Sequence, residues 1–184
     1  MQRRKFLQAT LLSLPLAGKA AAFSRPIKPV PPSFLVKAGK DRFNKPILYK
    51  GVNPNLVKIS AQDTNGQLAV FEFIGLEKTG PTLHLHLKQD EIFYVVAGEY
   101  LFQVGEVKQN LKAGDTIFLP RNVPHTWLQL TDKGQLIYQV QPAGKMEAFF
   151  KKMNSFKGRP SEEEINKIHQ EHGMKVVGPP LSLE

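Results

Sequence analysis

A chain of 184 residues with 41% hydrophobic and 22% charged residues has room for one compact soluble domain. The chain contains no cysteine, which excludes disulfide bonds, a thiolate nucleophile and cysteine-based zinc sites, so any metal must be held by nitrogen and oxygen. The formal net charge is +9, but after the first 22 residues the basic residues are scattered and form neither a run nor a helical stripe, so we expect no nucleic-acid partner.

The first 22 residues are expected to be an export signal. The run Arg3-Arg4-Lys5-Phe6-Leu7 leads into an apolar stretch without acidic residues, and mostly small residues follow from position 17 to 22. The stretch is too short to span a membrane stably. The run resembles the bacterial twin-arginine signal, which exports folded proteins, and an ordinary secretory signal is the alternative. We therefore expect a periplasmic or secreted protein with no membrane span after signal removal. Loss of the signal's four basic residues from 25 leaves 21 against 16 acidic residues, a net charge of +5.

Residues 23–46 are expected to form an extended N-terminal arm. Four prolines between positions 26 and 32 are incompatible with a helix. Such an arm is able to cover an exposed sheet edge of a neighbouring subunit, and we expect a homodimer.

Residues 47–141 show the pattern of an all-β sandwich or barrel. Short apolar or alternating runs are separated by turn residues such as Asn65-Gly66 and Gly98-Glu99. The expected strands cover 47–50, 67–76, 82–88, 92–96, 100–104, 116–119, 126–130 and 135–141.

Residues 142–184 are expected to hold a C-terminal helix and a tail. Ser161 and Glu164 have the spacing of a capping box, and Gly173 is placed to end the helix. The last apolar residues, 176–181, must be extended because they contain two prolines.

Two phenylalanines and two histidines of this C-terminal segment are expected to have structural rather than chemical roles. Phe149 and Phe150 are expected to pack the segment onto the barrel. His169 and His172 are three residues apart on the expected helix, and we interpret them as part of a solvated face rather than as a metal-binding pair.

The histidines and one glutamate of the expected strands form the candidate chemical site. His84 and His86 are two residues apart, so in a strand both imidazoles lie on one face. The chain must turn at residues 88–90 before Glu91 faces the same pocket. A second turn, at residues 120–124, precedes His125.

These residues resemble the two sequence motifs of the cupin family. The first motif stands here as Gly80, His84, His86, Glu91 and Gly98, and the second as Gly114, Pro120 and His125. The spacer after Gly80 is shorter than usual, and Asn122 stands where a turn glycine is common, a mild departure since Asn tolerates left-handed backbone angles.

The resemblance implies a cupin double-stranded β-helix, that is, a jelly-roll barrel, with a C-terminal helix and an extended N-terminal arm. It also implies one metal ion held by His84, His86, Glu91 and His125. The alternative is a cupin that has kept this fold and lost its metal.

Three imidazoles and one carboxylate suit one divalent transition metal, which is iron(II), manganese, nickel, copper or zinc, while magnesium and calcium prefer more oxygen ligands. Four protein ligands leave two positions of an octahedral ion for water, oxygen or substrate. Glu91 is the candidate catalytic residue, because a carboxylate that releases the metal is able to take a proton as a general base.

The expected substrate pocket contains Phe93, in phase with Glu91, and Trp127 and Gln129, in phase with His125. The resemblance to quercetin dioxygenase-like cupins implies oxygen chemistry on a small phenolic or enol-type molecule. The alternatives are a metal-dependent isomerase or lyase of sugars or keto acids and a non-catalytic, small-molecule-binding or sensory cupin.

Overall fold

The computed structural model describes residues 32–158 and 160–182, so the expected export signal and the arm up to residue 31 lie outside the described residues. The chain divides into two units, Met1–Pro32 and Ser33–Glu184. The fold described below is that of the second unit. Within the described ranges, no helix has the length and apolar character needed to cross a membrane.

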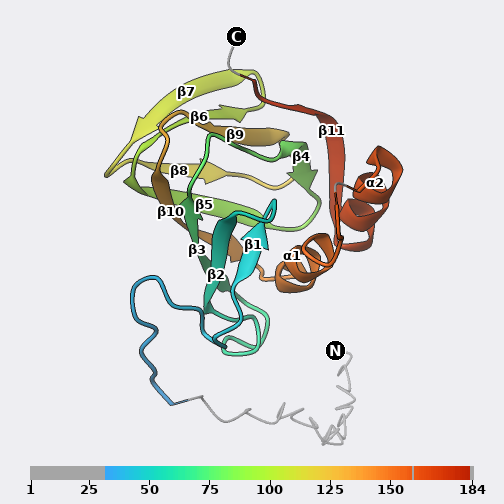
Figure 1. The fold of residues 1–184 in the computed structure, drawn as a ribbon. Coiled ribbons are helices and arrows are strands. Elements are labelled where there is room, and N and C mark those ends of the chain that lie inside the picture. Colours follow the sequence, from blue (N-terminus) through green and yellow to red (C-terminus); the bar gives the residue numbers. More distant parts are fainter. Residues whose placement is uncertain (1–31, 159, 183–184) are drawn as a thin grey trace, which may run out of the picture. The chain divides into compact units, whose positions relative to one another are not determined.

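The second unit is built on two antiparallel sheets (Figure 1). The six-stranded sheet has, in spatial order, β1 (Ile47–Tyr49), β2 (Asn53–Ile59), β3 (Ala69–Gly75), β10 (Gly134–Gln141), β5 (Asp90–Ala97) and β8 (Thr116–Leu119). The five-stranded sheet has β11 (Met174–Pro180), β4 (Thr82–His86), β9 (His125–Gln129), β6 (Glu99–Val104) and β7 (Val107–Lys112). From β3 to β6 and from β8 to β10 the chain alternates between the sheets, which is the winding of a double-stranded β-helix. The expected jelly-roll fold is confirmed.

Two strands, β2 and β7, were not predicted from the sequence, and features of each strand explain why. β2 contains Pro54, which the strand tolerates near its start, where it pairs only with the short edge strand β1. β7 is an edge strand whose residues are exposed on both faces except Leu111, so its sequence shows no alternation.

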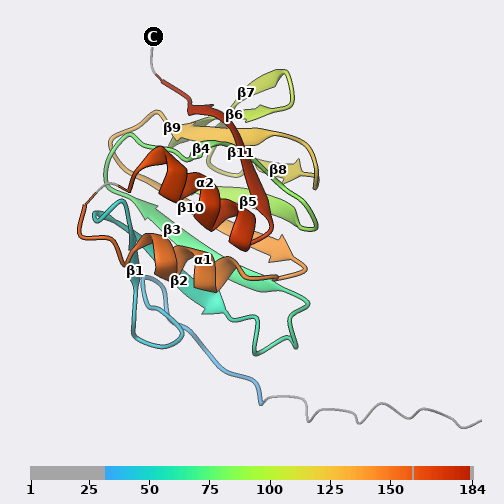
Figure 2. The same ribbon diagram turned by 90° about the vertical axis from the view of Figure 1, so that its right-hand side faces the viewer.

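Two helices follow the barrel, α1 (Met146–Met153) and α2 (Glu162–Glu171). The predicted capping box is confirmed, because the Glu164 amide donates to Ser161 Oγ at 3.2 Å and the Ser161 amide donates to Glu164 Oε2 at 2.8 Å. Gly173 follows α2 with φ of 79°, a left-handed conformation that glycine adopts without strain. Both helices lie on the same side of the barrel, beside β11, and face the viewer in Figure 2.

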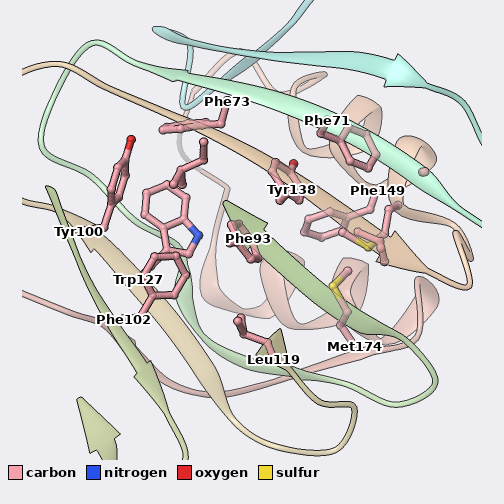
Figure 3. Close-up of a cluster of buried hydrophobic side chains, with 14 of the residues drawn as sticks. Phe71, Phe73, Phe93, Tyr100, Phe102, Leu119, Trp127, Tyr138, Phe149 and Met174 are labelled. Atoms are coloured by element: carbon pink, nitrogen blue, oxygen red, sulfur yellow. The ribbon is translucent and has the colours of Figure 1, made fainter. Parts of the chain in front are cut away.

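Aromatic side chains form a large part of the buried core (Figure 3). Tyr138 stacks on Phe71 and on Phe93, with ring centroids 5.1 and 4.8 Å apart. From α1, Phe149 is buried and Phe150 meets Phe71 edge to face. The expected packing of this segment onto the barrel is therefore confirmed.

The described part of the expected arm packs on its own chain. The Asp41 carboxylate is buried and accepts hydrogen bonds from the amides of Phe43 and Val57, both at 2.8 Å. Lys58, on β2, donates to the carbonyls of Lys37 and Lys40. These contacts tie residues 37–41 to the outer edge of the six-stranded sheet.

Two buried tyrosines are expected to lower the stability of the folded protein at alkaline pH. Burial raises the pKa of Tyr100 and of Tyr138, whose hydroxyl also donates to Asn55 Oδ1 at 2.9 Å. The folded chain then keeps protons that the unfolded chain releases, so this stabilisation is complete below about pH 10 and declines above it. An absorbance titration of tyrosinate, with urea unfolding across the same range, is expected to show late ionisation and falling stability. Ionisation of every tyrosine near pH 10 in the folded protein would contradict this.

Candidate metal centre

Three strands bring the four candidate ligands to one point inside the barrel. His84 and His86 come from β4, His125 from the neighbouring β9, and Glu91 from β5 in the opposite sheet. His84 and His125 are direct cross-strand partners. One ligand atom from each of the four residues lies within 4.8 Å of the others. This spacing is small enough for a single ion to touch all four.

Backbone carbonyl oxygens fix two of the imidazoles. His84 Nδ1 lies 2.8 Å from the Thr82 carbonyl oxygen, and His125 Nδ1 lies 3.0 Å from that of Val123. A carbonyl oxygen only accepts, so both Nδ1 atoms carry the proton and donate it. The Nε2 atoms therefore keep a lone pair, which is the form that binds a metal.

A side-chain amide fixes the third imidazole. His86 Nδ1 lies 3.2 Å from Gln89 Oε1, and Gln89 Nε2 donates to the carbonyls of Pro142 and Ala143 at 3.2 and 2.9 Å. The two carbonyls require the amide nitrogen on their side, so the amide oxygen faces His86. His86 thus also presents an unprotonated Nε2.

The centre holds polar atoms that need a cation. His86 Nε2 and His125 Nε2 are buried and have no hydrogen-bond partner among the described residues. Glu91 Oε2 lies 3.2 Å from His125 Nε2 and 3.6 Å from His86 Nε2. Lone pairs of nitrogen and oxygen at this distance repel each other unless a positive charge lies between them, and buried unpaired polar atoms are costly. A bound divalent metal ion meets both requirements.

The electrostatics favour neutral imidazole and ionised carboxylate. Burial lowers the pKa of His84 well below its usual value, and positive charge on His125 and His86 lowers it further. Burial alone would raise the pKa of Glu91, but the imidazoles of His86 and His125, when they are protonated, outweigh burial and lower that pKa to about 2. Such a set carries one negative charge with which to offset a dication.

The cluster opens onto a cavity of about 790 Å³. Two of the three expected pocket residues, Phe93 and Trp127, line this cavity together with the ligands. Gln129 does not line it, although it points into the barrel as expected. Its Oε1 accepts from the Tyr100 hydroxyl at 3.2 Å, and its Nε2 donates to the Thr131 carbonyl at 2.9 Å. Gln129 lies beyond Trp127 along β9, and its amide is already satisfied there.

The C-terminal segment supplies a wall of the cavity that the sequence did not indicate. The residues of this segment that line the cavity include Met146, Phe149, Phe150, Met153, Ile165, His169 and Met174. The interpretation of a solvated face is wrong for His169, which is 6% exposed and meets Phe149 at 4.8 Å between ring centroids. Its position four residues after Ile165, on the apolar stripe of α2, was the signal that could have placed it inside.

Replacing Gln89 with methionine is expected to weaken metal binding about 10- to 100-fold, because His86 loses the group that fixes its tautomer and ring orientation. Competition with a chromophoric chelator measures this affinity. Gln109→Met, at an exposed position on β7, is the matched control and is expected to change nothing. Equal affinity of the two variants would show that Gln89 has no part in holding the ligand.

Comparisons with known proteins agree with this fold and cluster. Residues 73–139 match the family model described as a cupin domain. An uncharacterized protein of Methanocaldococcus jannaschii is 30% identical over 80 residues, which are 44% of this chain and 53% of that protein. The chain thus spans about half the length of the curated relative it matches.

Two solved structures share the fold. KdgF from Halomonas sp. is 19% identical with a TM-score of 0.52, over 61% of this chain and 94% of that one. An RmlC-like cupin from Shewanella frigidimarina is 25% identical with a TM-score of 0.50, over 56% and 87% of the two chains. Together with the domain match, the buried cluster of three histidines and one glutamate indicates a divalent metal site typical of this domain.

Proposed function

We propose that this chain, in which residues 73–139 form a cupin domain, is a mononuclear metal-dependent dioxygenase that acts on a small phenolic or enol-type molecule. The observation that carries the proposal is the position of the buried ligand cluster on the wall of a large, mainly apolar cavity. A cavity of this kind accepts a flat organic molecule and orients it by a few polar groups.

A divalent transition ion, when bound, supplies Lewis acidity and, for a redox-active metal, oxygen chemistry. Four protein ligands would leave two positions of an octahedral ion for water, oxygen or substrate. The aromatic side chains of Phe93, Trp127 and Phe149 line the cavity and are able to hold a planar ring against the centre.

Glu91 is the proposed general base. Its carboxylate is ionised and buried, and it is the one ligand of the four whose oxygen can exchange between the cation and a proton. A phenol or enol that enters the cavity would transfer its proton to Glu91 as its oxygen approaches the centre. Because the pKa of Glu91 is about 2 beside positive charge, this transfer requires the carboxylate to move away from that charge first.

Oxygen uptake tests the proposal. Protein from its native compartment is analysed for metal and then screened in an oxygen electrode with quercetin, other flavonols and catechols. Uptake that depends on the metal and is lost after chelation is the expected result. Bound metal without uptake on any of these substrates would instead favour the sugar or keto-acid isomerase, or the non-catalytic binding protein.

The location and assembly that we propose are a periplasmic or secreted homodimer. Support for export comes from the arginine pair and the apolar stretch of the first 22 residues. Support for a dimer comes from exposed apolar side chains on the neighbouring strands β5 and β8, namely Tyr94, Val96 and Phe118. Cell fractionation with N-terminal sequencing tests the first, and sedimentation equilibrium tests the second.

A further inference from the structure

His169 is the buried polar side chain that the described C-terminal residues place in the cavity. It lies on α2, outside the segment that matches the cupin domain, and its ring centroid is 6.0 Å from that of His84. It is not a member of the cluster whose ligand atoms lie within 4.8 Å of one another. The position is therefore beside the metal centre and on the cavity side of it.

The protonation pattern of His169 follows from its contacts. Nδ1 lies 2.7 Å from the Ile165 carbonyl oxygen, which only accepts, so Nδ1 carries a proton and donates it. The edge of the ring packs against Phe149 and fixes its plane. Nε2 is then a lone-pair acceptor, and it makes no hydrogen bond with any described residue.

We propose that His169 is a ligand-binding residue whose Nε2 accepts a hydrogen bond from a hydroxyl group of the molecule held at the metal centre. The proposal rests on the proposed function in one respect, that a small organic molecule binds at this centre. A neutral acceptor selects a ligand that has a hydroxyl next to its metal-binding oxygen, as in a catechol. It gives no advantage to a ligand with a single oxygen, such as phenol, and it repels an anionic oxygen.

The neighbouring histidine provides a matched control. His172 Nδ1 also lies 2.7 Å from a carbonyl, that of Ile168, and its ring also meets Phe149, at 5.7 Å between centroids. It is only half-buried and does not line the cavity. The two histidines thus share their local contacts and differ in access to the cavity.

The test measures catechol and phenol binding to the full chain loaded with Co²⁺, without oxygen, from the visible spectrum of the metal. His169→Phe keeps the aromatic contact and removes the acceptor, and it is expected to weaken catechol binding about tenfold while phenol binding and metal content stay unchanged. His169→Gln, which offers an amide oxygen at similar reach, is expected to restore most of the affinity for catechol. His172→Phe is expected to change neither ligand's affinity.

Several outcomes would overturn the proposal. They are the absence of catechol binding to the wild type, equal affinity of wild type and His169→Phe for catechol, an equal loss for phenol, and loss of metal in His169→Phe. Oxygen uptake is measured separately. Catechol binding that depends on His169, without any oxygen uptake, would support the role of His169 and contradict the proposed dioxygenase. Oxygen uptake together with unchanged catechol affinity in His169→Phe would support the dioxygenase and contradict the role of His169.

Discussion

Replacing His125 with alanine is expected to lower metal affinity by more than about 100-fold. Loss of a residue that hydrogen-bonds to a metal ligand lowers affinity about 10- to 100-fold, and loss of the ligand itself costs more. His125 is 1% exposed, and its Nε2 faces Glu91 with no other partner. The metal content of the dialysed protein, measured by mass spectrometry against a set concentration of chelator, gives the result.

The control for this change is His172→Ala, which removes an imidazole outside the cluster and is expected to leave metal content intact. Circular dichroism of His125→Ala is expected to show a folded barrel, since the alanine removes a buried unpaired nitrogen along with the ring. Full metal retention in a folded His125→Ala protein would mean that the four residues do not form the site, and the proposed oxygen chemistry would fall with them.

Gly80→Ala is expected to destabilise the protein by about 3 kcal/mol, at the upper end of the usual cost of overpacking. A β-carbon on Gly80 would overlap the backbone carbonyl oxygen of Trp127 and lie 2.9 Å from its carbonyl carbon. Backbone atoms of β9 cannot rotate away as a side-chain end would, so β9 or the segment that leads into β4 must shift. Urea unfolding measures the change in the free energy of unfolding.

Gly158→Ala is the matched control for this second change. Gly158 has open space where a β-carbon would stand, and its φ is not positive, so the substitution is expected to be nearly neutral. A Gly80→Ala protein as stable as Gly158→Ala would show that the segment before β4 can move away from β9 at no cost. The start of the strand that carries His84 and His86 would then be less rigid than this close approach indicates.

The sequence predicted the barrel well where one face of a strand is buried. Alternation identified strands such as β5 and β10 because their buried and exposed side chains alternate along the strand. It failed for β7, where both faces meet solvent, and for β2, whose buried and half-buried residues do not alternate. Local pattern carries no signal in either case, because pairing with a neighbouring strand decides the structure.

The candidate site, like the fold, could be predicted from the sequence only in part. Strand parity alone placed His84 and His86 on one face, and the resemblance to the two cupin motifs added Glu91 and His125 to the same site. The structure brings all four together. Parity also placed Gln129 inside, but it does not say how far along the barrel the cavity reaches. His169 was misjudged because its burial depends on where α2 docks, and that is a property of tertiary packing rather than of the helix alone.

The strand that carries two of the four ligands depends on the end of the chain. β9 pairs with β4 only at His84 and His125, whereas β11 pairs along β4 from His86 to Thr82. Residues 174–180 are thus the longer of the two pairing partners that hold His84 and His86 in line. Detachment of β11 would therefore loosen two of the four ligands together, although none of the four lies on β11 itself.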